Sequence, residues 1–276
     1  MTLVQHADPY PHWLFTDPAT GDRLRLVPER GGLITGWECG GHERLYFDQQ
    51  RFADPALSVR GGIPVLFPIC GGLPDHPLPQ HGFARDRPWT IGALEGADSG
   101  VRLQLKDSPE TLLPFPHPFL LTLEVRLRPA ALEIEAVVEN TGTDLLPFSF
   151  GLHAYFQVSS LESVTIEGLP PRVLDQVSGE QVPVSERLAA LAAGVDLLAE
   201  PAGPVRLVDA VAGEVITLEP TAPLDLTVVW TDPPRSMVCL EPWSAPRGAL
   251  LSGDRLLRLA PGDSLRLRTR YALTAL

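Results

Sequence analysis

Alternation between apolar and polar residues is the feature that most constrains how this chain can fold. It is clear in DRLRLVPE (22–29), VRLQL (101–105) and LTLEVRLRP (121–129). A period of two places every second side chain on the same face of an extended strand. Strands of this kind have one buried face and one face in water, which is typical of antiparallel sheets. The sequence therefore predicts a chain built mainly from such strands.

The same pattern continues along the chain and predicts how strands pair. ALEIEAVVEN (131–140) follows the turn at Pro129 and Ala130, so we expect an antiparallel hairpin with the preceding run. Later alternating runs are SVTIEGL, EVITLEP, LDLTVVWTD and LRLRTRYAL, and the 29 prolines and 24 glycines mark turns between runs. We expect an all-β fold, a large antiparallel β-sandwich of two packed sheets, with residues 1–276 forming a single domain.

One segment departs from the strand pattern. SERLAALAAGVDLLAE (185–200) is rich in alanine and leucine and begins with a serine that can cap a helix. This composition predicts a helix that is interrupted near Gly194. No other segment carries a comparable helical signal.

Composition excludes several classes of protein. The formal net charge of −12 disfavours binding to nucleic acid, because phosphates repel an acidic surface. No apolar run approaches the length of a membrane span, and MTLVQHADPYPHWLF lacks the basic start and apolar core of a signal peptide. Cys39, Cys70 and Cys239 fit no disulfide framework and are expected to be reduced thiols. We therefore expect a cytoplasmic protein with no nucleic-acid or membrane partner.

Motifs for several common chemistries are missing from the sequence. It contains no GxGxxG or GxxxxGK[ST] loop for phosphates, no HExxH for a metal and no GxSxG elbow for a serine nucleophile. Lys106 is the only lysine and lies at the end of an alternating run, so no Schiff-base role is expected for it. The sequence predicts neither a metal nor a cofactor.

Two titratable residues lie in apolar surroundings. His153 lies in PFSFGLHAYFQV, and Glu241 lies in SMVCLEPWSAPRG. A buried charge is costly without a partner, so each residue is either a catalytic group in a pocket or a structural one. The structural alternatives are a hydrogen-bonded core histidine and a glutamate turned outward at a strand end. Trp243 offers an apolar face on which a sugar ring could stack.

Further polar residues cluster in PQHGFARDRPW (79–89), which includes His81 and Arg85. Arg60 lies at a similar position, directly before the apolar run GGIPVLFP. Taken singly, such arginines are most often surface residues or members of salt bridges.

Four segments, taken together, resemble a known family. RGGIPVLFPICGGLP (60–74), QHGFARDRPW (80–89), FSFGLHAYF (148–156) and VCLEPWSAPRGAL (238–250) occur in the order typical of the aldose 1-epimerase, or galactose mutarotase-like, superfamily. The resemblance is strongest to its hexose-6-phosphate 1-epimerase branch. HGFAR following GGIP is the most specific of these signals.

The resemblance implies roles for individual residues. His153 lies where the family keeps its general acid, and Glu241 lies where it keeps its general base. His81 matches a second histidine on the ring-oxygen side of the sugar. Arg60 and Arg85 match arginines that line the pocket, and in the phosphate-specific branch they are candidates for binding phosphate.

In this interpretation QHGFARDRPW forms one wall of the pocket. Gly82 would allow a close approach of the backbone, and Phe83 and Trp89 would mainly pack. Asp86 could pair with an arginine, and Arg87 would be structural.

The sequence departs from the family pattern between the two catalytic positions. Members often have an aspartate there that contacts sugar hydroxyls, but LLAEPAGPVRLVD (197–209) offers only Glu200 and Asp209 as rough substitutes. This leaves the identity of the sugar open.

The expected function is a cofactor-independent 1-epimerase that interconverts the α and β anomers of an aldohexose or hexose 6-phosphate. Its partner would be a small-molecule sugar or sugar phosphate, and the protein would be a monomer or weak dimer. The alternatives are a non-catalytic carbohydrate-binding protein with the same sandwich and a sandwich enzyme of the lyase or hydrolase type. Retention of both His153 and Glu241 favours the epimerase, because binding alone needs no acid–base pair.

Overall fold

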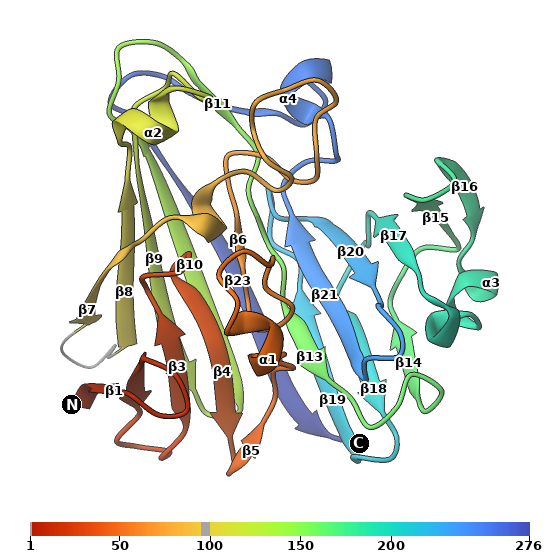
Figure 1. The fold of residues 1–276 in the computed structure, drawn as a ribbon. Helices are drawn as coiled ribbons and strands as arrows, with labels where there is room; N and C mark the ends of the chain where they lie inside the picture. Colours follow the sequence, from red (N-terminus) through yellow and green to blue (C-terminus); the bar gives the residue numbers. More distant parts are fainter. Residues whose placement is uncertain (1, 95–99) are drawn as a thin grey trace.

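The computed structural model describes residues 2–94 and 100–276, and two large antiparallel sheets dominate it (Figure 1). The first sheet contains, in spatial order, β14 (Val164–Glu167), β18 (Val205–Asp209), β19 (Glu214–Glu219), β23 (Ser264–Ala275), β10 (Ala131–Asn140), β9 (Phe119–Arg128), β8 (Gly100–Lys106) and β7 (Thr90–Leu94). The second contains β16 (Glu180–Pro183), β15 (Arg172–Asp175), β17 (Asp196–Ala199), β20 (Leu226–Trp230), β21 (Met237–Trp243), β12 (Gly151–Leu152) and β6 (Val65–Leu66), with β13 (Tyr155–Gln157) also paired to β21. This arrangement confirms the predicted all-β sandwich.

Smaller elements surround the two sheets. The N-terminal sheet contains β1 (Thr2–His6), β2 (His12–Thr16), β3 (Arg23–Val27), β4 (Leu33–Cys39) and β5 (His42–Glu43), and β11 (Leu146–Phe148) pairs with β22 (Leu257–Leu259). The helices are short: α1 (Gln49–Phe52), α2 (Pro109–Leu112), α3 (Val184–Leu188), α4 (Ala249–Ser252) and the 3-10 turns η1 (Ala84–Asp86) and η2 (Leu191–Ala193). In the described ranges, no helix has the length and apolar character needed to cross a membrane. The single-domain organisation stays a prediction.

The predicted hairpin is confirmed as β9 and β10. Leu127 pairs with Leu132 and Val125 pairs with Ile134, so the apolar residues of both strands share the core face. Ala130 closes the turn with φ of 51°, in the left-handed region.

The predicted helix over 185–200 is wrong for most of its length. The structure has α3, then η2, and then strand β17, in which Leu197 pairs with Val229 of β20. Leu197 and Ala199 are buried there. Pairing with the sheet and burial of these side chains therefore override the helical propensity of alanine and leucine.

Strand β21 presents different residues to its two faces. Val238 and Leu240 point into the main core, where the Tyr271 hydroxyl from β23 donates a hydrogen bond to the Leu240 carbonyl at 3.2 Å. Cys239 and Glu241 alternate with them and lie on the opposite face, yet both are buried. The candidate site is built on this second face.

The stretch 79–89 is held by its backbone against the sheet. Gly82 forms a bridge with Phe67 next to β6 and has φ of 72°. A Cβ atom at Gly82 would lie 2.1 Å from the Phe67 carbonyl oxygen, so a larger residue does not fit. Phe83 and Trp89 are buried, which confirms that they pack. The close approach that this glycine allows is therefore between two backbone segments.

We predict that Gly82→Ala destabilises the protein strongly, by about 2–4 kcal/mol, because it adds a clash with backbone to a left-handed conformation. Gly92→Ala in β7 is the matched control, since a Cβ there meets no atom within 4 Å. Urea unfolding monitored by circular dichroism measures both. Equal stability of the two variants would contradict the proposed backbone contact.

Candidate active site

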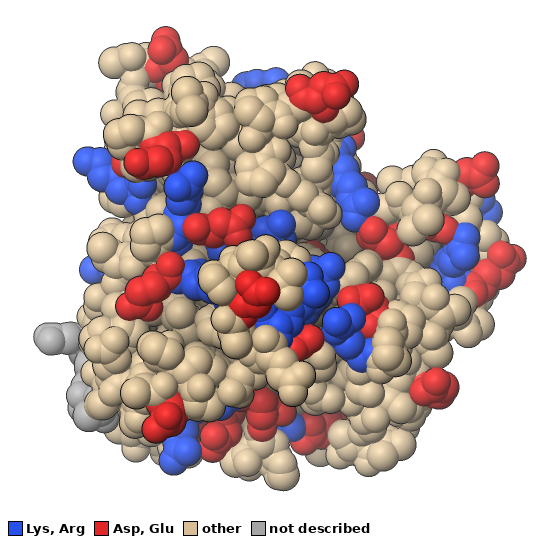
Figure 2. Space-filling view, viewed as in Figure 1, with Lys and Arg blue, Asp and Glu red and all other residues tan. Residues whose placement is uncertain are grey.

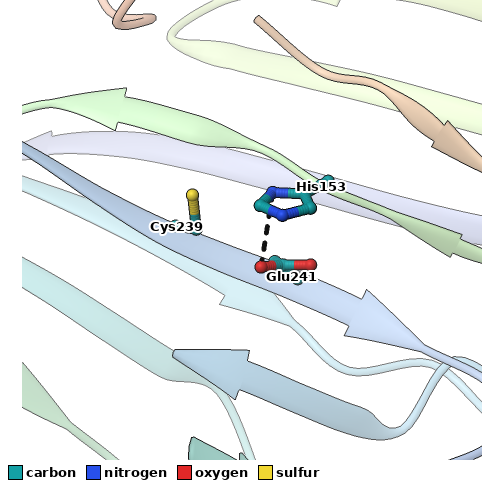
Figure 3. A group of neighbouring side chains, drawn as sticks. All are labelled: His153, Cys239 and Glu241. Atoms are coloured by element: carbon teal, nitrogen blue, oxygen red, sulfur yellow. Dashed lines mark ion pairs between the residues drawn. The ribbon is translucent and has the colours of Figure 1, made fainter. Parts of the chain in front are cut away.

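His153 and Glu241 form the centre of the site (Figure 3). His153 lies between β12 and β13, Glu241 lies in β21, and the imidazole Nδ1 is 3.3 Å from the carboxylate Oε1. Only 9% of His153 and 1% of Glu241 are exposed. The structure therefore brings together the two residues that the sequence singled out, and neither is a solvated surface residue.

Aromatic rings fix the orientation of the His153 imidazole. Tyr155 stacks parallel to it, with ring centroids 4.6 Å apart and an interplanar angle of 9°. Trp230 and His81 contact it edge-on at 5.7 Å and 5.5 Å. These contacts hold the ring with one edge toward Glu241.

Burial sets the protonation of the pair. It raises the pKa of Glu241 well above the usual range of a carboxylate. It also lowers the pKa of His153 well below that of an ordinary histidine, assisted by the positive charges of Arg85 and Arg60. Both shifts favour the neutral forms of the two side chains, with a proton on the Glu241 carboxyl and an uncharged imidazole at His153.

Trp243 supports Glu241 directly. The indole Nε1 donates a hydrogen bond to the second carboxylate oxygen, Oε2, at 3.0 Å. This bond lowers the pKa of Glu241 and partly offsets the effect of burial. Trp243 lines the pocket, although only 1% of it is exposed. The stacking of a sugar ring on Trp243 stays a prediction.

His81 has a strained backbone and a neutral ring. Its φ is 66°, in the left-handed region that few non-glycine residues adopt. Nδ1 accepts a hydrogen bond from the Gly71 amide at 3.1 Å. Burial and the charges of Arg85, Arg247 and Arg60 lower the pKa of His81 to about 3. Nε2 therefore carries the proton and is the ring atom that can donate a hydrogen bond.

The two predicted arginines, Arg60 and Arg85, both line the pocket. In Figure 2, basic side chains lie around a hollow to the right of the centre. Arg60 Nε lies 3.5 Å from Asp232 Oδ2, and its guanidinium carbon lies 5.6 Å from the centroid of the Trp230 ring. Arg85 donates to the Gln80 carbonyl at 2.8 Å and approaches Asp86 only to 4.0 Å.

Sequence reasoning missed a second ion pair in the pocket. Arg247 and Asp196 both line it, and Arg247 Nη2 lies 2.7 Å from Asp196 Oδ2. Arg247 lies inside the motif VCLEPWSAPRGAL, so the motif itself could have suggested it. Asp196 is the first residue of β17 and was hidden by the apparent helix.

The predicted substitutes for the family's aspartate do not line this pocket. Glu200 pairs with Arg255 at 2.9 Å. Asp209 lies in β18 of the other sheet, where it accepts hydrogen bonds from backbone amides, including that of Ser159 at 2.7 Å. Asp196, which directly precedes the segment 197–209, lines the pocket instead.

One group in the described ranges has the residue types of a metal site. His153, Cys239 and Glu241 place ligand atoms within 4.8 Å of one another (Figure 3). Burial and the nearby Glu241 raise the pKa of the Cys239 thiol well above its usual value, whereas a metal ligand must be a thiolate. The arginines of the pocket also oppose a cation. These features favour acid–base chemistry at this position, and the absence of a metal stays a prediction.

The profile described as aldose 1-epimerase matches residues 26–272, which is most of the chain. The chain belongs to the aldose 1-epimerase family. Across residues 1–276 it is 34% identical to the Slr1438 protein of Synechocystis sp. PCC 6803, with a TM-score of 0.90, covering 100% of this chain and 97% of that one. A galactose 1-epimerase from Lactobacillus acidophilus NCFM shares the fold at 14% identity and a TM-score of 0.73, with 99% and 98% coverage.

Curated relatives carry a more specific name. Proteins named "Putative glucose-6-phosphate 1-epimerase" are 37% identical over 150 residues in Cenchrus ciliaris and 31% identical over 153 residues in Escherichia coli K12. These alignments include 50% and 54% of this chain, and 45% and 50% of the relatives. The chain thus aligns with about half the length of the curated family members it matches.

Proposed function

We propose that the protein is a cofactor-independent hexose-6-phosphate 1-epimerase that interconverts α and β anomers by opening the sugar ring. The observation that carries the proposal is the buried His153–Glu241 pair, 3.3 Å apart, in a pocket lined by arginines. Family membership supports an epimerase acting on a carbohydrate. The name of the curated relatives supports a phosphorylated sugar.

Anomer exchange needs one base and one acid. Glu241 takes the proton of the C1 hydroxyl, and His153 gives a proton to the ring oxygen, so that the C1–O5 bond breaks. The resulting aldehyde turns about the C1–C2 bond, and the ring closes on its other face with the proton transfers reversed. The single proton of the pair serves both directions, and each transfer contributes about 10²–10⁴-fold in rate.

The distribution of charge in the pocket supports a sugar orientation in which the ring oxygen faces His153 and the C1 hydroxyl faces Glu241. Arg60 and Arg85 lie close enough to His153 to lower its pKa, whereas Asp196 and Arg247 act on Glu241. In a hexopyranose, C6 is attached to C5, next to the ring oxygen. A sugar whose ring oxygen faces His153 therefore directs its 6-phosphate toward Arg60 and Arg85.

Substrate binding would also favour protonation of His153, the proposed acid. The negative charges of the phosphate offset those of Arg60 and Arg85, which raises the pKa of His153. The proton of the pair then moves to His153 and leaves Glu241 ionised, which is the arrangement that ring opening requires. Asp196 and the Nε2 hydrogen of His81 would bind sugar oxygens.

His153→Ala and Glu241→Gln test the chemistry. Each is expected to reduce catalysed anomer exchange by at least about 10²-fold, because each removes one of the two proton-transfer groups. Exchange NMR of hexose 6-phosphates and free hexoses measures the rate, and circular dichroism checks the fold. A wild-type rate in either variant rules out this mechanism. A wild-type protein that binds sugars without exchange would instead indicate a carbohydrate-binding function.

Arg60→Gln and Arg85→Gln test the substrate. A charge-assisted contact to phosphate contributes about 1.5–3 kcal/mol, or about one to two powers of ten in kcat/KM. Each variant should lose this factor for hexose 6-phosphate and far less for the free hexose. Equal losses for both substrates would mean that the arginines only shape the pocket, and would favour a plain aldose 1-epimerase.

A further inference from the structure

A row of alternating charges continues outward from Arg60. Asp232 Oδ2 lies 3.5 Å from Arg60 Nε and 2.8 Å from Arg235 Nη1, and Arg235 Nη2 lies 3.7 Å from Asp48 Oδ2. Their side chains are between 22% and 30% exposed, so the row lies at the surface around the pocket. In Figure 2, acidic and basic side chains lie next to one another around the hollow to the right of the centre.

Backbone contacts hold both ends of this row. The Asp48 amide donates to the Arg60 carbonyl at 2.9 Å, and the Asp48 side chain accepts from the Arg51 amide at the start of α1 at 3.0 Å. In the middle of the row, the Arg235 amide donates to the Asp232 carbonyl at 3.1 Å. The charged groups therefore come from two anchored segments, and their order is built into the fold.

The two candidate phosphate-binding arginines differ in how far their charges are balanced. The 4.0 Å contact of Arg85 is to Asp86, whose side chain is 61% exposed. Arg60 instead contacts Oδ2 of Asp232, and Arg235 contacts the same oxygen atom. The contact of Asp232 with Arg235 is the shorter of the two, at 2.8 Å against 3.5 Å for Arg60.

We propose that Asp232 is a specificity-determining residue: it is the counter-ion of Arg60 in the free protein and competes with the phosphate group of the substrate. Arg235 is the positioning residue that limits this competition. The inference rests on the proposed function for its substrate, but the competition itself applies to any phosphate anion that contacts Arg60. Asp232 contacts Nε of Arg60, and Nη1 donates to Ser58 Oγ at 3.4 Å. Asp232 therefore weakens phosphate binding through its charge and not by occupying the Nη groups.

The proposal predicts opposite effects for two variants. Asp232→Asn keeps an acceptor of the same shape but removes the competing charge, so phosphate should bind more tightly. Arg235→Gln removes the group that draws Asp232 away, so the carboxylate moves onto Arg60 and phosphate should bind more weakly. Because exposed ion pairs are weak, each change should be about two- to five-fold. Glu167→Gln, in β14 of the other sheet, is a control with the same change in net charge as Asp232→Asn.

The experiment has two readouts on the full-length protein. Titration calorimetry with inorganic phosphate measures anion affinity without catalysis. Exchange NMR measures the ratio of kcat/KM for glucose 6-phosphate to that for glucose. Both the affinity and the ratio should rise in Asp232→Asn, fall in Arg235→Gln and stay at the wild-type value in Glu167→Gln.

Changes in the same direction in Asp232→Asn and Arg235→Gln would overturn the proposal, since a merely structural role predicts losses in both. An Asp232→Asn affinity equal to wild type would overturn it as well. Failure of the proposed function looks different: the wild-type protein would then catalyse no anomer exchange, while the opposite shifts in phosphate affinity would still identify Asp232 as the counter-ion.

Discussion

The buried contact between His153 and Glu241 is the interaction on which the rest of the site depends. A buried polar side chain without partners is destabilising, and Glu241, which is 1% exposed, has two neighbours: the imidazole at 3.3 Å and the indole N–H of Trp243 at 3.0 Å. The sandwich makes this possible because β21 buries both of its faces. Val238 and Leu240 fill the core, and the opposite face is left for the polar pair.

Charge in the pocket is organised around this pair. Arg60 and Arg85 act on the histidine, and the ion pair of Asp196 with Arg247 acts on the glutamate. Burial favours neutral side chains at His153 and Glu241, and an anion beside the arginines would favour a charged His153. In the proposed mechanism, binding of the phosphate and proton transfer are linked through these charges. The overall charge of −12 is compatible with an anionic ligand because the positive charges are local.

Much of this could be predicted from the sequence, and the exceptions have physical reasons. Alternation predicts the sandwich and the β9–β10 hairpin because strand period and burial are local properties. The prediction from composition fails over 185–200, where the pairing of β17 with β20 depends on a segment that lies about thirty residues later. The same error hid Asp196, because a residue inside the predicted helix was not expected to line the pocket. The contact of Asp232 with Arg60 joins residues far apart in the chain, and no local pattern reports it.

The most direct test of the account is the protonation of His153, measured by nitrogen-15 NMR of the imidazole at neutral pH. Because its pKa is lowered, the ring should be neutral in the free protein. Saturation with a 1,5-anhydrohexitol 6-phosphate, which lacks the anomeric hydroxyl and cannot react, should move the shifts toward those of a protonated imidazole. An imidazolium in the free protein, or a ring that stays neutral when the analogue is bound, would contradict the central claim that one shared proton moves to His153 when substrate binds.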